Sequence, residues 1–342
     1  MRRIDYRVDV LRNGVRFGHM DFDSSDPPAV YCDADLAVNL SMRGTLLPNA
    51  AADLLTDELQ PVCILDGVEH PLGVYRVATR LDRMTDTGMR WEIEAYDRAV
   101  VLQQRKLEAR ASWAAGTSYD DVVLHYLQQA GLNRVILRPS GHTLQTTRED
   151  WEIGTSFLTV INDLLAEINY RDLWFDLEGV AHAEPYEAPS ASNIAHHYGL
   201  HGRAAKLLSP EYTVELDVFN KPNVFIAVLS NPELSPAVAT AVNDFPQSRL
   251  SILRRGMRIP QVYKVDNIAA GELQAYANRL RDEGMQTGEY VDVSSPAYPD
   301  HGVNDTVALE LPELHGLYRE TRWSISMRAG DMMTHTLERM VF

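Results

Sequence analysis

Cysteine is scarce in this sequence, with only Cys32 and Cys63 among 342 residues. Two thiols cannot form the disulfide framework of a small secreted domain, and they are too few for a structural zinc site without help from histidine. Both cysteines lie in apolar, strand-like surroundings. We therefore expect two buried free thiols.

Long hydrophobic runs are also missing. No segment approaches the ~18 consecutive apolar residues that indicate a membrane-spanning helix, so we expect no transmembrane segment. The N-terminus, MRRIDYRVDVLRNG, is charged and alternating, and it lacks the apolar core of a signal peptide. It therefore predicts the first strand of a mature protein that is made in the cytoplasm.

Basic residues are the minority charge. The 32 lysines and arginines are outnumbered by 48 aspartates and glutamates, which gives a net charge of −16. A surface that grips nucleic acid needs clustered lysine and arginine, so we expect no specific nucleic-acid binding. An acidic lining would instead let DNA or another cargo slide past, because like charges prevent adhesion.

Catalytic motifs are absent from the sequence. It contains no G-x-S-x-G, no G-x-x-x-x-G-K-[ST] and no G-x-G-x-x-G, which are the patterns of serine hydrolases and nucleotide-binding proteins. Neither cysteine has the basic neighbour or helix start that activates a thiol. We expect no enzyme activity, no catalytic residue and no cofactor. A pair of acids for glycoside cleavage stays open as an alternative, because 48 acids allow many pairs.

A histidine cluster, His196, His197 and His201, occurs in the segment HHYGLH. On a helix, the spacing of four between His197 and His201 would place both rings on one face, where they could hold a metal. Gly199 lies between them, however, and no glutamate follows His197 as the zinc-protease motif requires. The favoured interpretation is a polar loop or interface patch without a metal, and metal binding stays open as the alternative.

Residues 1–104 have the pattern of short strands joined by tight turns. Alternating residues 7–11 lead into the pair Asn13-Gly14, a strong hairpin signal, and Asp66-Gly67 is a second turn of this kind. Residues 90–95 (RWEIEA) alternate cleanly between apolar and polar side chains. These features predict a small β-barrel or β-sandwich.

Residues 105–200 change to helical spacing. Ser118 is a predicted N-cap for a helix over 119–130, and a second helix begins near Ser156. A strand–Glu178-Gly179–strand hairpin follows.

The last third of the sequence returns to strands. Residues 214–218 and 224–229 predict strands, whereas 231–260 shows little periodicity. A third helix covers 269–283, and three strands follow over 307–341. The predicted fold class is therefore α+β, with β regions at both ends of the chain.

The order of these segments resembles the baseplate hub proteins of contractile-tailed phages and defective prophage particles. It is also similar to the late-control and spike-hub group of injection machines. The most telling stretch is PLGVYRV…EAYDRAVVL…GTSYDDVVLHYLQQAG, which begins at Pro71. The run Trp151–Thr155, the hairpin at Glu178-Gly179 and a late helix ending in Arg279-Leu280 continue the order, so the resemblance covers nearly the whole chain.

The resemblance implies two tube-like β-barrel domains, related by an internal pseudo-twofold, with an inserted α+β domain. It maps the first tube-like domain to 1–104, the α+β domain to 105–205 with part of 240–300, and the second tube-like domain to 206–239 and 300–342. Three copies would form a ring that joins a hexameric tail tube to the central spike, at the baseplate of a virion tail or phage-tail-like particle assembled in the bacterial host cytoplasm. The implied partners are further copies of the chain and the tail tube, central spike and tape-measure proteins.

Acidic side chains are expected to line the lumen of such a ring. Glu92 and Glu94 lie opposite the apolar face of their strand, and Glu215 and Asp217 alternate with apolar residues in theirs. The alternative for all four is an ordinary solvent-facing acid.

Two other roles stay open. One is a tail-associated cell-wall hydrolase or carbohydrate-binding tail protein, and the other is a neighbouring tail component such as a distal tail protein. Some hub relatives carry fused lysozyme or peptidase domains or a long needle. This sequence ends at Phe342, directly after its last predicted strand, so lytic activity and the spike are expected from separate proteins.

Overall fold

The computed structural model describes residues 3–49, 51–187, 190, 192–201, 206–207, 211–216, 218–219, 221–231, 234–265, 268, 271–285 and 288–341. Its helices are α1 (Ala99–Gln104), α2 (Tyr119–Gln129), α3 (Phe157–Glu167), α4 (Ile252–Arg255) and α5 (Leu273–Gly284). Its strands are β1 (Ile4–Arg12), β2 (Val15–Met20), β3 (Ala29–Asp33), β4 (Leu40–Leu46), β5 (Glu58–Leu65), β6 (Val68–Pro71), β7 (Tyr75–Thr85), β8 (Gly88–Asp97), β9 (Val135–Leu137), β10 (Trp174–Phe175), β11 (Ala181–Ala183), β12 (Ile194–Gly199), β13 (Thr213–Leu216), β14 (Val224–Leu229), β15 (Ala237–Val242), β16 (Pro260–Val265), β17 (Glu289–Pro296), β18 (Thr306–Leu311), β19 (Leu314–Ser326) and β20 (Met332–Arg339).

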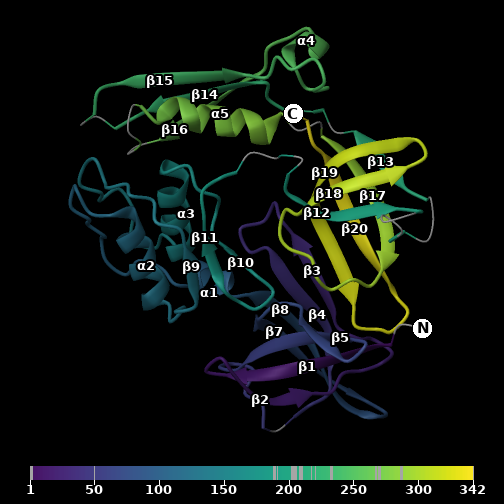
Figure 1. Ribbon diagram of the computed structural model, residues 1–342. Coiled ribbons are helices and arrows are strands. Elements are labelled where there is room, and N and C mark those ends of the chain that lie inside the picture. Colours follow the sequence, from purple (N-terminus) through teal and green to yellow (C-terminus); the bar gives the residue numbers. More distant parts are fainter. Residues whose placement is uncertain are drawn as a thin grey trace.

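One large, open sheet contains both ends of the chain (Figure 1). Its order is β13-β17-β20-β19-β3-β4-β8-β7-β5-β1-β2, with β12 joined through β18 to β19 and β6 joined to β5. The β19–β3 pair, in which Trp323 lies opposite Cys32, connects the C-terminal strands to the N-terminal ones. Trp323 and Ile325 are buried in the same core as the residues of β1 to β8, so the two β regions pack as one body.

The two predicted hairpin turns of the first β region are confirmed. Asn13 and Gly14 have φ values of 53° and 74°, and Asp66 and Gly67 have 52° and 88°. Positive φ at both central residues is what a type I′ turn requires, and asparagine, aspartate and glycine tolerate it best. These turns join β1 to β2 and β5 to β6. The predicted buried thiols are also confirmed, because Cys32 and Cys63 are both free and buried.

The helical unit consists of α1, α2 and α3 beside a small sheet of β10, β11 and β9. The Ser156 hydroxyl accepts a hydrogen bond from the Thr159 amide at 3.1 Å, which caps α3 as predicted. Ser118 precedes α2 as predicted, but its side chain makes no capping hydrogen bond. The apolar stripes of α2 and α3 meet in a core that includes Val122 and Ile161. None of the described helices is long and apolar enough to traverse a lipid bilayer.

A second small sheet, β15-β14-β16, packs against α5. Here strand pairing divides the chain differently from the expected boundaries. The expected second tube-like domain includes 206–239, but β14 lies in this separate sheet, and among the described residues of that range only those of β13 join the large one. Conversely, β12 and β17 join the large sheet from ranges expected in the α+β domain. The weak periodicity of 231–260 concealed β15 and the start of β16.

Arg98 joins the first β region to the helical unit. Its guanidinium donates to both carboxylate oxygens of Glu58, at 2.9 and 2.6 Å, and to the Gly179 carbonyl at 2.7 Å. A bidentate arginine–carboxylate pair holds both partners in one orientation. The predicted Glu178-Gly179 turn is therefore fixed against the base of the first β region.

Asp97, the last residue of β8, is a fully enclosed carboxylate. Its oxygens accept from the amides of Leu40 and Ala99, each at 2.8 Å. Burial raises the pKa of Asp97 to about 6, although these hydrogen bonds act in the opposite direction. The folded chain therefore binds this proton more tightly than the unfolded chain, in which aspartate has a pKa of about 4.

We predict that Asp97 makes the fold less stable as pH rises from about 4 to about 6. The sign follows because the folded state holds more protons than the unfolded state in that window, and the expected loss is about 2 to 3 kcal/mol. Urea unfolding of the wild type and of Asp97→Asn across this window isolates the effect, since asparagine does not titrate. Equal pH slopes for the two proteins would contradict the prediction.

Candidate functional site

The two ends of the large sheet are edge strands with exposed apolar side chains. On β2, Val15 and Phe17 are 68% and 52% exposed, and on β13, Val214 and Leu216 are 46% and 47% exposed. An edge strand with unpaired backbone groups and apolar side chains is a template for pairing with another chain. Both ends of the sheet therefore have the character of an assembly surface.

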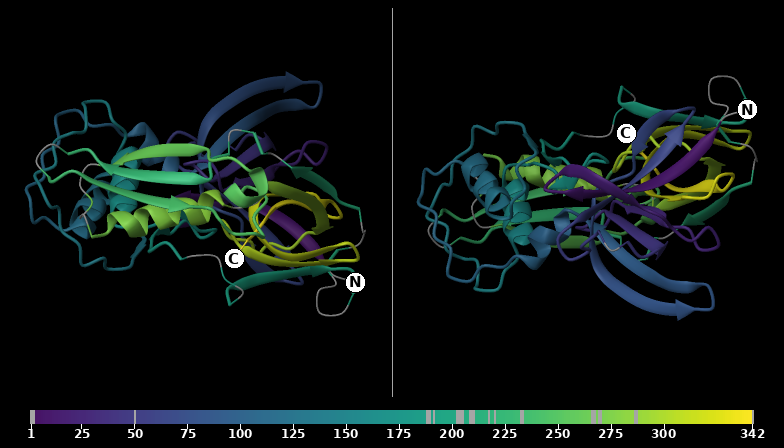
Figure 2. Two further views of the ribbon diagram at one scale, coloured as in Figure 1. Left: turned by 90° about the horizontal axis from the view of Figure 1, so that it is seen from above. Right: turned by 90° about the horizontal axis from the view of Figure 1, so that it is seen from below.

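A long hairpin formed by β7 and β8 extends away from the body of the molecule (blue in Figure 2). Residues 78–84 of β7 are exposed, and they include the large apolar side chains Leu81 and Met84. Monomeric proteins seldom present such side chains together on a projecting element without a partner. The hairpin is thus a third surface suited to contact with another chain.

Glu92 and Glu94, two of the predicted lumen acids, lie next to each other on the outer face of β8. Ile93 and Ala95 point into the core between and beside them, as the alternation predicted. Each acid has an arginine partner on a neighbouring strand: Glu92 pairs with Arg83, and Glu94 with Arg43 at 2.7 Å. This part of the face is therefore charge-balanced rather than uniformly acidic.

Glu215, the third predicted lumen acid, lies on β13 opposite Tyr290 of β17. Every residue of β13 is exposed, so Val214 and Leu216 do not form a buried face there. The alternation of this strand was therefore no guide to burial, because no layer of the protein covers either side of it. Asp217, the fourth predicted acid, falls outside the described residues.

The sequence favours a polar loop or interface patch for HHYGLH, but the loop is wrong for most of the segment. Its first four residues belong to β12, which pairs in parallel with β18 in the large sheet. His196 is buried, whereas His197 and His201 are exposed. The spacing of four between His197 and His201 has no helix to act on, because His197 lies on β12 and His201 follows the end of that strand. Within β12, alternate side chains lie on opposite faces, so His196 and His197 point apart.

His196 lies in a buried cluster that the sequence did not predict. Its ring centroid is 4.2 Å from that of His301, which in turn is 5.2 Å from that of His335. His196 Nε2 is 3.1 Å from Asp305 Oδ2. These residues come from β12, from the loop between β17 and β18, and from β20, so no local sequence pattern could have grouped them.

Glu320 of β19 is the centre of this cluster. Its two oxygens lie 2.8 Å from His301 Nδ1 and 2.5 Å from His335 Nδ1, and its side chain is fully buried. Burial alone would raise the pKa of Glu320, but the hydrogen bonds from the two histidines lower it to about 2. Burial lowers the pKa of His301. Glu320 is therefore a buried carboxylate that accepts hydrogen bonds from His301 and His335.

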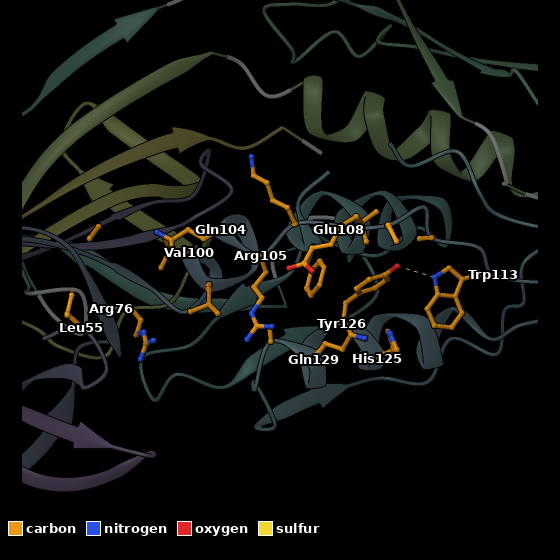
Figure 3. Close-up of a pocket in the computed structure, with 18 of the residues that line it drawn as sticks. Leu55, Arg76, Val100, Gln104, Arg105, Glu108, Trp113, His125, Tyr126 and Gln129 are labelled. Atoms are coloured by element: carbon orange, nitrogen blue, oxygen red, sulfur yellow. Dashed lines mark hydrogen bonds between the residues drawn. The ribbon is translucent and has the colours of Figure 1, made fainter. Parts of the chain in front are cut away.

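A groove of about 1000 Å³ separates the first β region from the helical unit. Figure 3 shows Arg76 on one side and Arg105, Tyr126 and Trp113 on the other. The Trp113 indole donates to the Tyr126 hydroxyl at 3.1 Å, which fixes the aromatic wall. Grooves between units that combine aromatic and charged side chains are common ligand sites, but these contacts select no particular ligand.

Comparison with known proteins places the fold. No protein-family model matches the sequence, and no curated protein matches it. Solved structures do match. The chain is similar to a tail protein from Neisseria meningitidis, with 12% identity, a TM-score of 0.66, and coverage of 98% of this chain and 97% of that one. It is also similar to the 43 kDa tail protein of prophage MuSo2 from Shewanella oneidensis, with 9% identity, a TM-score of 0.67 and coverage of 98% of each chain.

A third similar structure comes from a secretion machine. It is the c3393 protein of E. coli, described as a component of the type VI secretion system with structural similarity to bacteriophage T4 tail proteins. The identity is 12%, the TM-score is 0.52, and the match covers 97% of this chain and 76% of that one. The chain thus has the fold of phage tail proteins over nearly its whole length. In particular, the resemblance to the phage tail baseplate hub group is confirmed at the level of the fold.

Proposed function

We propose that this protein is a non-enzymatic structural hub in the baseplate of a phage tail or phage-tail-like injection particle. Three copies form a ring that joins the hexameric tail tube to the central spike. The tail proteins of similar fold support a structural role in a tail. The observation that carries the proposal is the large sheet, which is open and ends in two apolar edge strands.

The open sheet fits a ring closed between copies. The edge strand β2 of one copy pairs with β13 of the next, which covers Val15 and Phe17 on one side and Val214 and Leu216 on the other. Contact between two different surfaces is head-to-tail, and it closes a ring when the rotation between copies is a whole fraction of a turn. Such pairing also satisfies the unpaired backbone groups of both strands.

The ring provides six positions from three chains. One tube-like unit consists of β1 to β8, and the other consists of β12, β13 and β17 to β20, so two units in each of three copies match a hexameric tube. In this ring Glu92, Glu94, Glu215 and Asp217 would contribute to the lining of the lumen. Arg83 and Arg43, the partners of Glu92 and Glu94, moderate the repulsion of passing DNA or other cargo rather than abolish it, because the chain as a whole remains acidic.

Charged substitutions on one edge strand are predicted to dissociate the ring. Val214→Lys with Leu216→Lys should leave the fold within about 0.5 kcal/mol of wild type, because both side chains are exposed in the single chain. At the proposed interface the same lysines would have to be buried, and burying an unpaired charge is costly. The molar mass of the protein in solution should therefore fall from that of a trimer to that of a monomer. Size-exclusion chromatography with light scattering, with the tail tube protein present, measures this.

Two controls sharpen the experiment. Val238→Lys with Val262→Lys changes two exposed valines, on β15 and β16 of the small sheet that packs against α5, and should leave the trimer intact. Mixing a Val15→Lys/Phe17→Lys variant with the β13 variant should give a dimer and nothing larger, because one intact pair of edges remains. A wild-type chain that stays monomeric at high concentration beside its tube partner would count against the hub.

The alternative role as a cell-wall hydrolase or carbohydrate-binding tail protein has a direct test. The hub predicts no clearing in a zymogram of bacterial cell walls and no retention on immobilised glycans. Clearing or retention that follows the purified chain would favour the alternative role.

A further inference from the structure

Four side chains with metal-binding atoms converge in the part of the large sheet formed by β12 and β17 to β20. His196 belongs to β12, Glu320 to β19, and His301 and Asp305 to the loop between β17 and β18. Each offers one ligand atom, and these atoms all lie within 4.8 Å of one another. We propose that they form a structural site for one divalent transition-metal ion, for which zinc is the representative.

The donor set fits this class of ion. Two imidazole nitrogens and two carboxylate oxygens are a common environment for zinc and its first-row neighbours, whereas magnesium and calcium prefer oxygen alone. In a tetrahedral site with bonds of ~2.1 Å, the ligand atoms lie roughly 3.4 Å apart. The widest pair of the cluster therefore has to close by up to roughly 1.4 Å, which side-chain rotation can supply.

Charge balance also favours a cation. Glu320 is fully enclosed and Asp305 is partly buried, so two carboxylates lie among histidine, tyrosine and tryptophan rings. A cation near these rings is Lys206, whose ammonium lies over the Tyr198 ring at 5.5 Å. Burying carboxylates without a counter-charge is costly, and buried charges are therefore paired or bound to metals. One divalent ion neutralises both.

An outer layer of hydrogen bonds would orient the ligands. His301 Nε2 lies 2.9 Å from the Tyr198 hydroxyl, so the ion would bind at Nδ1 and displace the proton that Nδ1 shares with Glu320. The second oxygen of Glu320 is held by His335, whose Nε2 lies 2.8 Å from Ser295 Oγ. Partners of this kind fix the ring orientation and the basicity of metal ligands in known sites.

The backbone is irregular at the ligand positions. The register of β12 against β18 shifts between Ile194 and His196, and that of β19 against β20 shifts between Glu320 and Arg322. β-Bulges re-aim side chains and are frequent beside functional sites. A Cβ at Gly302 would lie 2.7 Å from Asp305 Oδ1, so glycine there leaves room for the carboxylate.

His196 provides a separate indication. Its ring is 5% exposed, yet Nδ1 is buried with no hydrogen-bond partner in the described part of the chain. An unsatisfied polar atom in the interior costs free energy and calls for a partner. A metal ion bound at Nδ1 of His196 would be such a partner.

The enclosure of the cluster makes the ion structural. His301 and Glu320 have no exposed side-chain surface, whereas a catalytic zinc keeps one position open to water. The ion would tie β12 and the β17–β18 loop to β19, in the region that carries the β13 edge of the sheet.

The test uses the full-length chain, stripped with a chelator, loaded with zinc chloride and passed through a gel-filtration column. We expect one zinc per chain by elemental analysis. Zinc should also raise the melting temperature by several degrees over the stripped protein, and magnesium should not. Asp305→Asn and His301→Gln should each weaken zinc binding by about tenfold or more. His197→Gln is the matched control, because His197 is the exposed neighbour of His196 on β12, and it should bind zinc as the wild type does.

Cobalt provides a readout that needs no variant. Substitution of Co²⁺ into the wild-type chain should give the intense visible absorption of a four-coordinate site, so the result stands even if His301→Gln fails to fold. The proposal is overturned if the wild type retains no zinc after gel filtration. It is equally overturned if folded Asp305→Asn retains as much zinc as the wild type.

Discussion

Arg148→Met is expected to destabilise the helical unit by about 3 to 5 kcal/mol, because it breaks a buried ion pair by removing one partner. Arg148 is 3% exposed, and its Nη1 donates to both oxygens of Glu167 at 2.6 Å. The Tyr119 hydroxyl also donates to Glu167, at 2.9 Å. Without the arginine, an enclosed carboxylate loses its counter-charge. Guanidinium unfolding followed by the fluorescence of Trp151, whose ring lies 4.3 Å from the Arg148 guanidinium carbon, measures the loss.

The penalty for losing Arg148 should grow with pH. Burial already raises the pKa of Glu167 to about 7 with the arginine in place, and removal of the arginine raises it further. Both proteins lose stability as pH rises from about 4 to about 7, because Glu167 stays protonated in the folded state. Above about pH 7 the folded wild type releases this proton and the folded variant keeps it, so the difference in stability between them grows there. At acidic pH, where Glu167 is protonated in both states, the penalty should be smallest.

Two variants distinguish the buried pair from a general effect of losing a charge. Arg148→Met combined with Glu167→Leu removes both charges and should recover most of the stability, because an apolar pair avoids the cost of desolvation. Arg110→Met removes an exposed arginine of the same unit, paired with Glu149 at 3.4 Å, and should change stability by less than about 1 kcal/mol. A loss as large in Arg110→Met as in Arg148→Met would disprove the assignment.

Gly44→Ala is expected to cost about 3 kcal/mol or more, because both space and backbone conformation exclude a side chain there. A Cβ at this position in β4 would lie 2.4 Å from the Cα of Pro28. The obstacle is backbone, so it cannot rotate away, and overpacking of this kind costs about 1 to 3 kcal/mol. Gly44 also has φ of 150°, which adds roughly 1 to 3 kcal/mol of strain for any other residue.

The consequence of Gly44→Ala should spread across the centre of the sheet. β4 pairs with both β3 and β8, and β3 is the strand that receives β19 from the C-terminal region. Thermal unfolding of the full chain should show a melting temperature lowered by several degrees. Gly18→Ala on β2 is the matched control, since nothing lies within 4 Å of a Cβ there. Similar melting temperatures for the two variants would show that β4 can shift to make room.

Much of the local structure could be predicted from the sequence. The hairpins at Asn13-Gly14 and Asp66-Gly67 and the helices that begin after Ser118 and Ser156 follow from the conformational limits of a few adjacent residues. The clean alternation of RWEIEA placed Ile93 and Ala95 inside the protein, with Glu92 and Glu94 outside. The fold likeness came from the order of such segments along the chain.

The candidate sites could not be predicted in the same way. The sequence grouped His196, His197 and His201 because they are neighbours, but the structure groups His196 of β12 with His301 of the β17–β18 loop and Glu320 of β19. The Arg43 and Arg83 partners of Glu92 and Glu94, the predicted lumen acids, also come from other strands. A spacing rule within one strand does not identify such partners.

By itself the sequence determined where turns and helices form, which face of a well-alternating strand is apolar, and the α+β class. Only the tertiary structure decided that β19 pairs with β3, that β14 leaves the large sheet, that every residue of β13 is exposed, and that two histidines bind one buried glutamate. The physical reason is that turns and helices depend on interactions within a few residues. The partner of a strand depends on packing and hydrogen bonding with distant segments, and a two-residue alternation does not encode which segment that is.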